Sequence, residues 1–239
     1  SLETLSGPFN VDLRESRVGQ RQIDRLDLDG SFAAGRVTFT LDGALPGAAL
    51  RAEGRARPFD DMPTFQVAGT AQNVDLGVLL PGSGRTDSFA GEFAVVGRGK
   101  SVDTFSGTAA LDLTRAEIGL PNRRLQFTNA QVDADIDRGR IEFDADVTLA
   151  RNEGRIVALG LLELGTPLNY AVSDGEAYGL NLEALTGNPG LNSDLTGAFT
   201  LSGAGLDLTQ APIDLTAQLR DSRYGTYELA AADLDVKLR

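Results

Sequence analysis

The sequence has no cysteine, no histidine, no tryptophan and one methionine in 239 residues. Without histidine and cysteine, Ser-His-Asp and Cys-His catalysis, thiol redox chemistry and zinc sites built on imidazole or thiolate are excluded. Carboxylate, hydroxyl, lysine and arginine chemistry remains, but no cluster of these residues stands out as catalytic. We therefore expect no enzyme activity, no cofactor and no bound metal.

Positive charge and long apolar runs are also scarce. The chain carries 34 acidic and 22 basic residues, a net charge of −12, which would repel nucleic-acid phosphates. No window approaches 18 consecutive apolar residues, so we expect no transmembrane segment here. The first residues show no basic segment followed by an apolar one, so no signal peptide is visible. Because both ends lie inside patterned sequence, we expect a fragment of a longer protein.

Apolar and polar residues alternate along almost the whole chain, for example through Val37, Phe39 and Leu41 and again through Ile141, Phe143 and Ala145. A period of two indicates half-buried β-strands. Short turn signals such as DRGR and RNEGR separate the runs and favour antiparallel neighbours. The pattern predicts an all-β protein with about 14 to 16 strands. We expect the phenylalanines of these runs to share one side and residues such as Thr38 and Asp144 to face water.

The helical signal is small and occurs at two places. Leucines spaced at i, i+3 and i+4 follow Asn73 in NVDLGVLLPG and Asn181 in GLNLEALTG. Asparagine is a favoured N-cap residue, so each segment is predicted to form a helix of at most two turns.

These two segments lie 106 residues apart and belong to an internal repeat. Residues 74–119 align with 180–225 without a gap, and Gly91 matches Gly197 while Phe93 matches Phe199. The matches are the glycine, leucine and phenylalanine positions that set turns and the apolar face. We interpret residues 1–239 as one continuous β-repeat module, with units at about 19–119 and 120–225 and the start of a further unit at 226–239.

The repeat resembles the AsmA-like family, in particular the β-repeat region of TamB-type proteins. The segments that carry the resemblance are VDLGVLLPG, SFAGEFAVVG and GTAALDLTRAEIG, which recur as LNLEALTG, DLTGAFTLSG and IDLTAQLRDSRYG. What the resemblance implies is an elongated antiparallel sheet folded along its length into a half-pipe, or β-taco, with an apolar concave face. A closed β-sandwich is the alternative, because half-buried strands look the same in both.

The resemblance also implies a function. Proteins of this type are similar to bridge-like lipid carriers of the bacterial envelope, with an inner-membrane anchor, a periplasmic groove and phospholipid transport or outer-membrane assembly as their role. On this basis we expect a periplasmic segment that shelters glycerophospholipid acyl chains, with an outer-membrane barrel protein as a further partner of the parent chain. The candidate lipid-groove residues are Val37, Phe39, Leu41, Phe65, Val67, Phe89, Phe93, Val95, Leu111, Leu113, Ile141, Phe143, Val147, Ile156, Leu195, Phe199, Leu201, Leu215 and Leu219.

Two other interpretations stay open. A repeat-built stalk or adhesin would seal the same apolar face and bind protein through its sheet edges. The acidic segment QVDADIDRGRIEFDADV has Asp133, Asp135 and Asp137 at the spacing of the first calcium ligands of an EF-hand. The required glycine is replaced by Arg138, however, and aspartates that alternate with apolar residues are typical of the solvated face of a hairpin.

Overall fold

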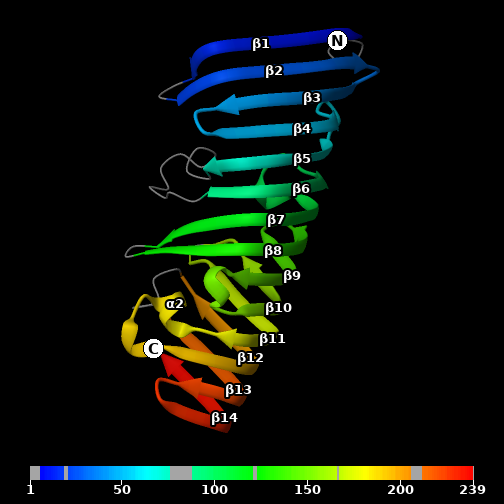
Figure 1. The fold of residues 1–239 in the computed structure, drawn as a ribbon. Helices are drawn as coiled ribbons and strands as arrows, with labels where there is room; N and C mark the ends of the chain where they lie inside the picture. The colour runs from blue at the N-terminus through cyan, green and yellow to red at the C-terminus, as the bar shows by residue number, and fades with distance from the viewer. Residues whose placement is uncertain are drawn as a thin grey trace.

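The computed structural model describes residues 6–18, 21–75, 88–120, 123–165, 167–205 and 212–238. These residues form one antiparallel sheet in which the strands follow each other in chain order from β1 to β14 (Figure 1). The strands are β1 (Gly7–Val18), β2 (Arg21–Ala33), β3 (Arg36–Leu45), β4 (Ala48–Arg57), β5 (Thr64–Asp75), β6 (Ser88–Arg98), β7 (Ser106–Leu120), β8 (Arg123–Asp137), β9 (Arg140–Leu149), β10 (Arg155–Glu163), β11 (Asn169–Leu180), β12 (Ser193–Ala204), β13 (Ile213–Tyr224) and β14 (Tyr227–Leu238).

Short connections explain why every strand pairs with the next one. The turn between β8 and β9 has Arg138 and Gly139 at its centre, with φ of 49° and 84°. Positive φ at both central residues matches the twist of two antiparallel strands, and Asp137 and Arg140 close the hairpin. The all-β prediction and the antiparallel order are therefore confirmed.

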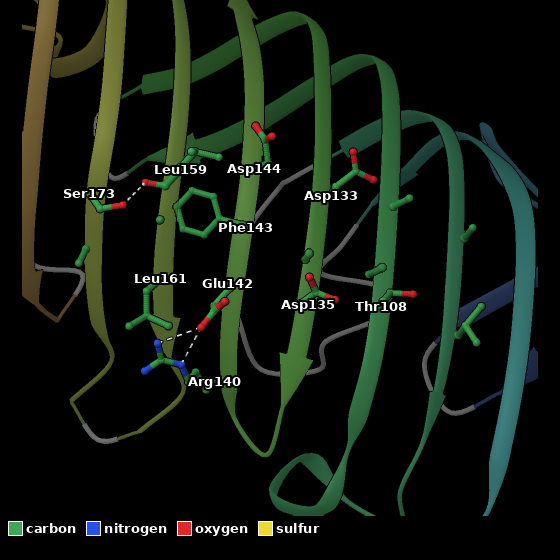
Figure 2. A pocket seen from close by; sticks show the side chains of 17 residues that line it. Thr108, Asp133, Asp135, Arg140, Glu142, Phe143, Asp144, Leu159, Leu161 and Ser173 are labelled. Carbon is green, nitrogen blue, oxygen red and sulfur yellow. Dashed lines mark hydrogen bonds and ion pairs between the residues drawn. The ribbon is translucent and has the colours of Figure 1, made fainter.

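The sheet is a single open layer. In the described ranges the substantial contacts of each strand are with its sheet neighbours, and β1 and β14 do not pair with each other. The strands bend along their length, as Figure 2 shows where they arch over at one end, so the sheet is a half-pipe and not a closed sandwich. The accessible surface of 14762 Å² is about 1.4 times that of a compact protein of this size.

Register shifts help the strands to bend. The pairing of β5 with β6 slips between Ala71 and Val74, and that of β11 with β12 slips between Ala177 and Leu180. A β-bulge increases local twist and bends the strand that carries it. The two bulges lie 106 residues apart, which is the spacing found in the sequence, while the boundaries of the two repeat units stay predictions.

One α-helix lies in the described ranges. Helix α2 (Leu182–Thr186) begins after Asn181, whose side chain accepts a 3.0 Å hydrogen bond from the backbone N–H of Glu183. It ends at Gly187, which has a left-handed backbone. This segment and its cap were predicted from the sequence. The other predicted helix, at residues 76–80, lies outside the described residues, and Asn73 belongs to β5.

The length of the sheet gives a test of the fold in solution. Fourteen strands about 4.8 Å apart extend over roughly 60 Å. A compact globule of 239 residues would have a radius of gyration of about 18 Å. Small-angle X-ray scattering is expected to give a clearly larger radius, and a value at or below 18 Å would contradict the open half-pipe.

Candidate apolar groove

One face of the sheet is apolar from the first strand to the last. The strand register places residues opposite one another in rows that cross all fourteen strands. The first central row consists of Phe9, Gly30, Phe39, Gly54, Val67, Val95, Ala109, Ala134, Phe143, Gly160, Val172, Leu201, Leu215 and Val236. The second consists of Val11, Leu28, Leu41, Ala52, Gly69, Phe93, Leu111, Val132, Ala145, Ala158, Gly175, Phe199, Ala217 and Leu234. No polar side chain interrupts either row.

The rows on either side continue this surface. One passes through Leu113, Val147, Ile156 and Leu219, and the other through Val37, Phe65 and Ile141. Apart from Phe89 and Leu195, every residue of the predicted groove belongs to one of these four rows, so these residues share one face. Beyond the bulges, Phe89 pairs with Val74 and Leu195 pairs with Leu180, which extends the apolar surface at the same margin. The role of these residues in lipid binding stays a prediction.

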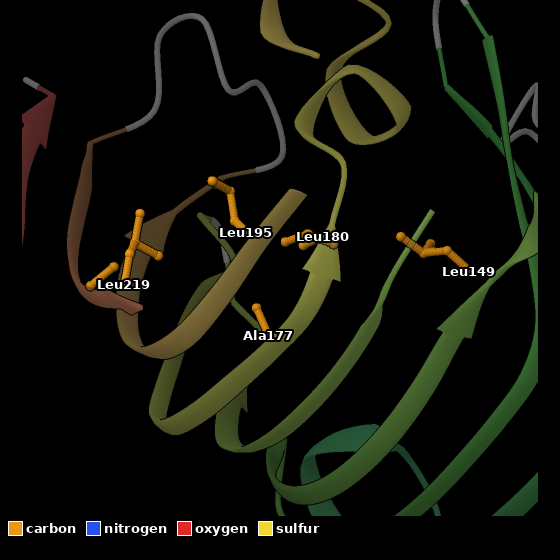
Figure 3. Close-up of a cluster of buried hydrophobic side chains, with 6 residues drawn as sticks. Leu149, Ala177, Leu180, Leu195 and Leu219 are labelled. Atoms are coloured by element: carbon orange, nitrogen blue, oxygen red, sulfur yellow. The ribbon is translucent and has the colours of Figure 1, made fainter. Parts of the chain in front are cut away.

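A buried hydrophobic cluster closes part of this face in the C-terminal half. Its buried members are Leu149, Ala177, Leu180, Leu195, Ala217 and Leu219, and Leu182 and Leu185 of α2 pack against them. Figure 3 shows the labelled side chains inside the bend of the strands. The α2 segment therefore covers one margin of the apolar face at β11 to β13.

Most of the remaining apolar face is only half-buried. Leu149 and Val74 are the large side chains that are fully buried in the described ranges, whereas Phe39, Phe93 and Phe143 each keep partial exposure. A sheet with one apolar face normally packs that face against a second layer. Here the described residues supply no such layer, so a long apolar surface about 60 Å in length is left open.

The opposite face carries the charged side chains, with alanine, valine and leucine side chains between them at β6 to β10. A row on this face runs through Asn10, Asp29, Thr40 and Glu53, and farther along Asp133 lies opposite Asp144. Figure 2 shows a shallow hollow on this face, where carboxylates lie beside apolar side chains such as Leu159; Arg140 there donates a 2.9 Å hydrogen bond to Glu142. No group of three or more potential metal ligands was found in the described ranges.

Ion pairs join charged side chains along strands and across neighbouring strands of this face. The Arg155 guanidinium donates a 2.7 Å hydrogen bond to Asp146, and this bond lowers the pKa of the Asp146 carboxyl. A hydrogen bond to Glu176 raises the pKa of Tyr178. Asp133, Asp135 and Asp137 alternate along extended β8, so they do not form a calcium-binding loop. The interpretation of this segment as a solvated hairpin face is confirmed.

The first two strands also contribute to the apolar face, although none of their residues is among the predicted groove residues. Leu26 and Leu28 lie on the apolar face, as do Phe9 and Val11 of β1. Leucine and aspartate alternate in DRLDLDG, so this contribution could have been predicted from the sequence. The same pattern that places Asp27 and Asp29 in water places the two leucines on the opposite side.

The described ranges contain no helix with the length and apolar character needed to cross a membrane. In comparisons with protein-family models, curated proteins and solved structures, none matches the chain.

Proposed function

We propose that this chain is a non-enzymatic segment of a TamB- or AsmA-like envelope protein that shelters lipid acyl chains along its apolar face. The observation that carries the proposal is the pair of uninterrupted apolar rows across an open, single-layer sheet. Apolar surface left in water is unfavourable by about 25 cal/mol for each Å². A continuous apolar patch of this length marks a binding surface.

The character of the lining favours hydrocarbon chains as the occupant. Its side chains are aliphatic or phenyl, with glycine and alanine between them, so the two central rows offer no hydrogen-bonding side chain. Protein interfaces of comparable size normally include polar side chains and hydrogen bonds. Acyl chains require neither, whereas the charged headgroup can remain in water at the open side of the groove.

The cellular role is the broader part of the proposal. The resemblance to the AsmA-like family supports a periplasmic position within an inner-membrane-anchored parent and phospholipid transport between the two membranes or outer-membrane assembly. Glycerophospholipids are the proposed cargo, and an outer-membrane barrel protein is a proposed partner of the parent chain.

Two adjacent valines of β6 provide a matched test of the proposed groove. Val95 belongs to a central apolar row, whereas Val96 lies on the polar face and is 45% exposed. We expect a photo-crosslinking amino acid at position 95, but not at position 96, to form adducts with phospholipid when the protein is expressed in bacteria. Mass spectrometry of the irradiated protein identifies the adducts, and native mass spectrometry of the unmodified chain should show co-purified lipid. Equal lipid labelling from both positions would contradict the groove.

A stalk or adhesin segment is the second candidate. The outer edges of β1 and β14 are not paired in the described sheet, and Val11 and Leu234 on these strands are 40% and 41% exposed. An unpaired strand can bind another strand through its backbone. Protein adducts from a photo-crosslinking amino acid at position 11 of β1 or 234 of β14, with no lipid adducts at position 95, would support this function instead.

A further inference from the structure

Aromatic rings lie over glycines of neighbouring strands at several places on the apolar face. Phe39 covers Gly54, Phe93 covers Gly69, and Phe199 covers Gly175. A methyl group on Gly54 would come within 2.7 Å of the Phe39 ring, and one on Gly69 within 2.9 Å of the Phe93 ring. The last two pairs lie 106 residues apart, so the arrangement belongs to the repeat. Each ring therefore rests on the apolar face of the sheet in the space that a side chain would otherwise fill.

At Gly175, the steric conflict with the covering ring can be studied without a conflict with backbone atoms. A Cβ atom at position 175 would lie 2.6 Å from Cζ, 2.7 Å from Cε1 and 2.8 Å from Cε2 of Phe199, and these are its three nearest atoms. At Gly54 and Gly69, backbone atoms of a neighbouring strand are also too close. The backbone of Gly175 is outside the left-handed region, so an alanine there conflicts with the ring and not with its own backbone.

The steric conflict between an alanine at position 175 and the Phe199 ring would occur beside the buried cluster. Phe199 packs against the buried cluster that Leu182 and Leu185 of α2 also contact. The groove is thus bounded at its margin by α2 beside this ring. A Cβ at position 175 would push the ring away from the sheet, because the ring lies directly over this position of the neighbouring strand.

We propose that Gly175 is a positioning residue of the groove, which keeps the Phe199 ring flat so that acyl chains can pass along the wall. This inference rests on the proposed function. Ring cover of a strand glycine is known to stabilise sheets, and that effect alone would predict only a change in stability. The additional role is steric: glycine at the covered position sets the depth of the groove.

The test uses the whole chain with Gly175→Ala, Gly43→Ala and the double variant Gly175→Ala/Phe199→Leu. Gly43 lies on the same face, but a Cβ there would be 3.4 Å from Leu26 and 3.6 Å from the Leu50 backbone oxygen, which are ordinary contacts. The probe is pyrene-labelled phosphatidylethanolamine presented in vesicles of phosphatidylethanolamine and phosphatidylcholine, which are zwitterionic and so do not repel the acidic chain. Uptake is measured by pyrene fluorescence of the protein after the vesicles are removed, and folding by circular dichroism melts.

We expect Gly175→Ala to lower lipid uptake about tenfold, a free-energy change within the range of overpacking effects. Gly43→Ala should take up lipid like the wild type, and the double variant should recover most of the loss because leucine has no ring to lift. If Gly175→Ala does not fold, the double variant must fold and bind. A double variant that fails to recover would overturn the positioning role.

A second measurement separates this inference from the proposed function. The α-protons of Gly175 should show an upfield ring-current shift in the NMR spectrum of the wild type, and Phe199→Leu should abolish it. Normal lipid uptake by Gly175→Ala would overturn the positioning role alone. A wild-type protein that takes up no pyrene lipid, with the ring-current shift present, would overturn the proposed function and the role together.

Discussion

Replacement of Phe143 by arginine is expected to leave the chain folded and to abolish lipid co-purification. Phe143 lies in a central apolar row between Ala134 and Gly160, and its ring covers Gly160. Because the side chain is only half-buried, the loss of phenyl burial should cost about 1–2 kcal/mol. A long arginine can extend its guanidinium out of the open groove into water. The guanidinium also interrupts the apolar path. An acyl chain that passes the arginine must either strip water from the charged group or lie next to that water in the groove.

Leu159→Arg is the matched control for this experiment. Leu159 belongs to the adjacent strand β10, lies on the polar face opposite Asp144 and is 44% exposed. The substitution introduces the same charge at a position outside the apolar rows, so folding and bound lipid should both be retained. Circular dichroism and lipid extraction followed by mass spectrometry measure the two properties. A folded Phe143→Arg protein with wild-type lipid content would reject the groove, whereas an unfolded one would show that the face is sealed in solution.

The strands and their faces could be predicted because each depends on local sequence. Alternation through Phe39 and Phe143 identifies both residues as members of an apolar face. Short turns such as Arg138-Gly139 then impose antiparallel neighbours, so the faces of successive strands join. No long-range information is needed for this step, because in the described sheet every strand pairs with the next in the chain.

The openness of the sheet could not be derived from alternation. Phe93 would alternate with Glu92 in the same way whether its face lined a groove or packed against a second sheet. The resemblance to half-pipe proteins supplied that expectation, and the pairing order from β1 to β14 bears it out. Sequence pattern records which side of a strand avoids water, but not what covers that side.

The register shifts and the ring-covered glycines were also beyond sequence reasoning. A bulge such as that between Ala71 and Val74 depends on how two strands pair, and alternation describes one strand at a time. Similarly, the sequence shows Gly175 only as a glycine within a strand, and the contact with the Phe199 ring of the next strand becomes apparent only in the structure. The repeat did provide an indirect signal, because Gly69 and Phe93 recur 106 residues later as this pair.

Truncation of Leu149 is expected to have the largest effect on stability among single aliphatic substitutions in the C-terminal cluster. Leu149 is 1% exposed and packs with Leu180, Leu195 and Leu219. Leu149→Ala removes buried methyl groups and leaves a cavity, which typically lowers the free energy of unfolding by about 2–5 kcal/mol. Leu159→Ala, on the exposed polar face, should change it by about 0.5 kcal/mol or less. Urea denaturation of the two variants measures the difference.

The strands that Leu149→Ala destabilises should be those near the substituted residue. Because strands contact mainly their sheet neighbours, stability in this chain is close to a sum of local terms along the sheet. Hydrogen–deuterium exchange of Leu149→Ala should therefore accelerate in β8 to β13, around the cluster and α2, while β2 to β4 exchange as in the wild type. Uniform acceleration from β1 to β14 would instead mean that the sheet unfolds as one cooperative unit. In that case the C-terminal cluster would stabilise the whole groove, including the open N-terminal strands that have no comparable cluster in the described ranges.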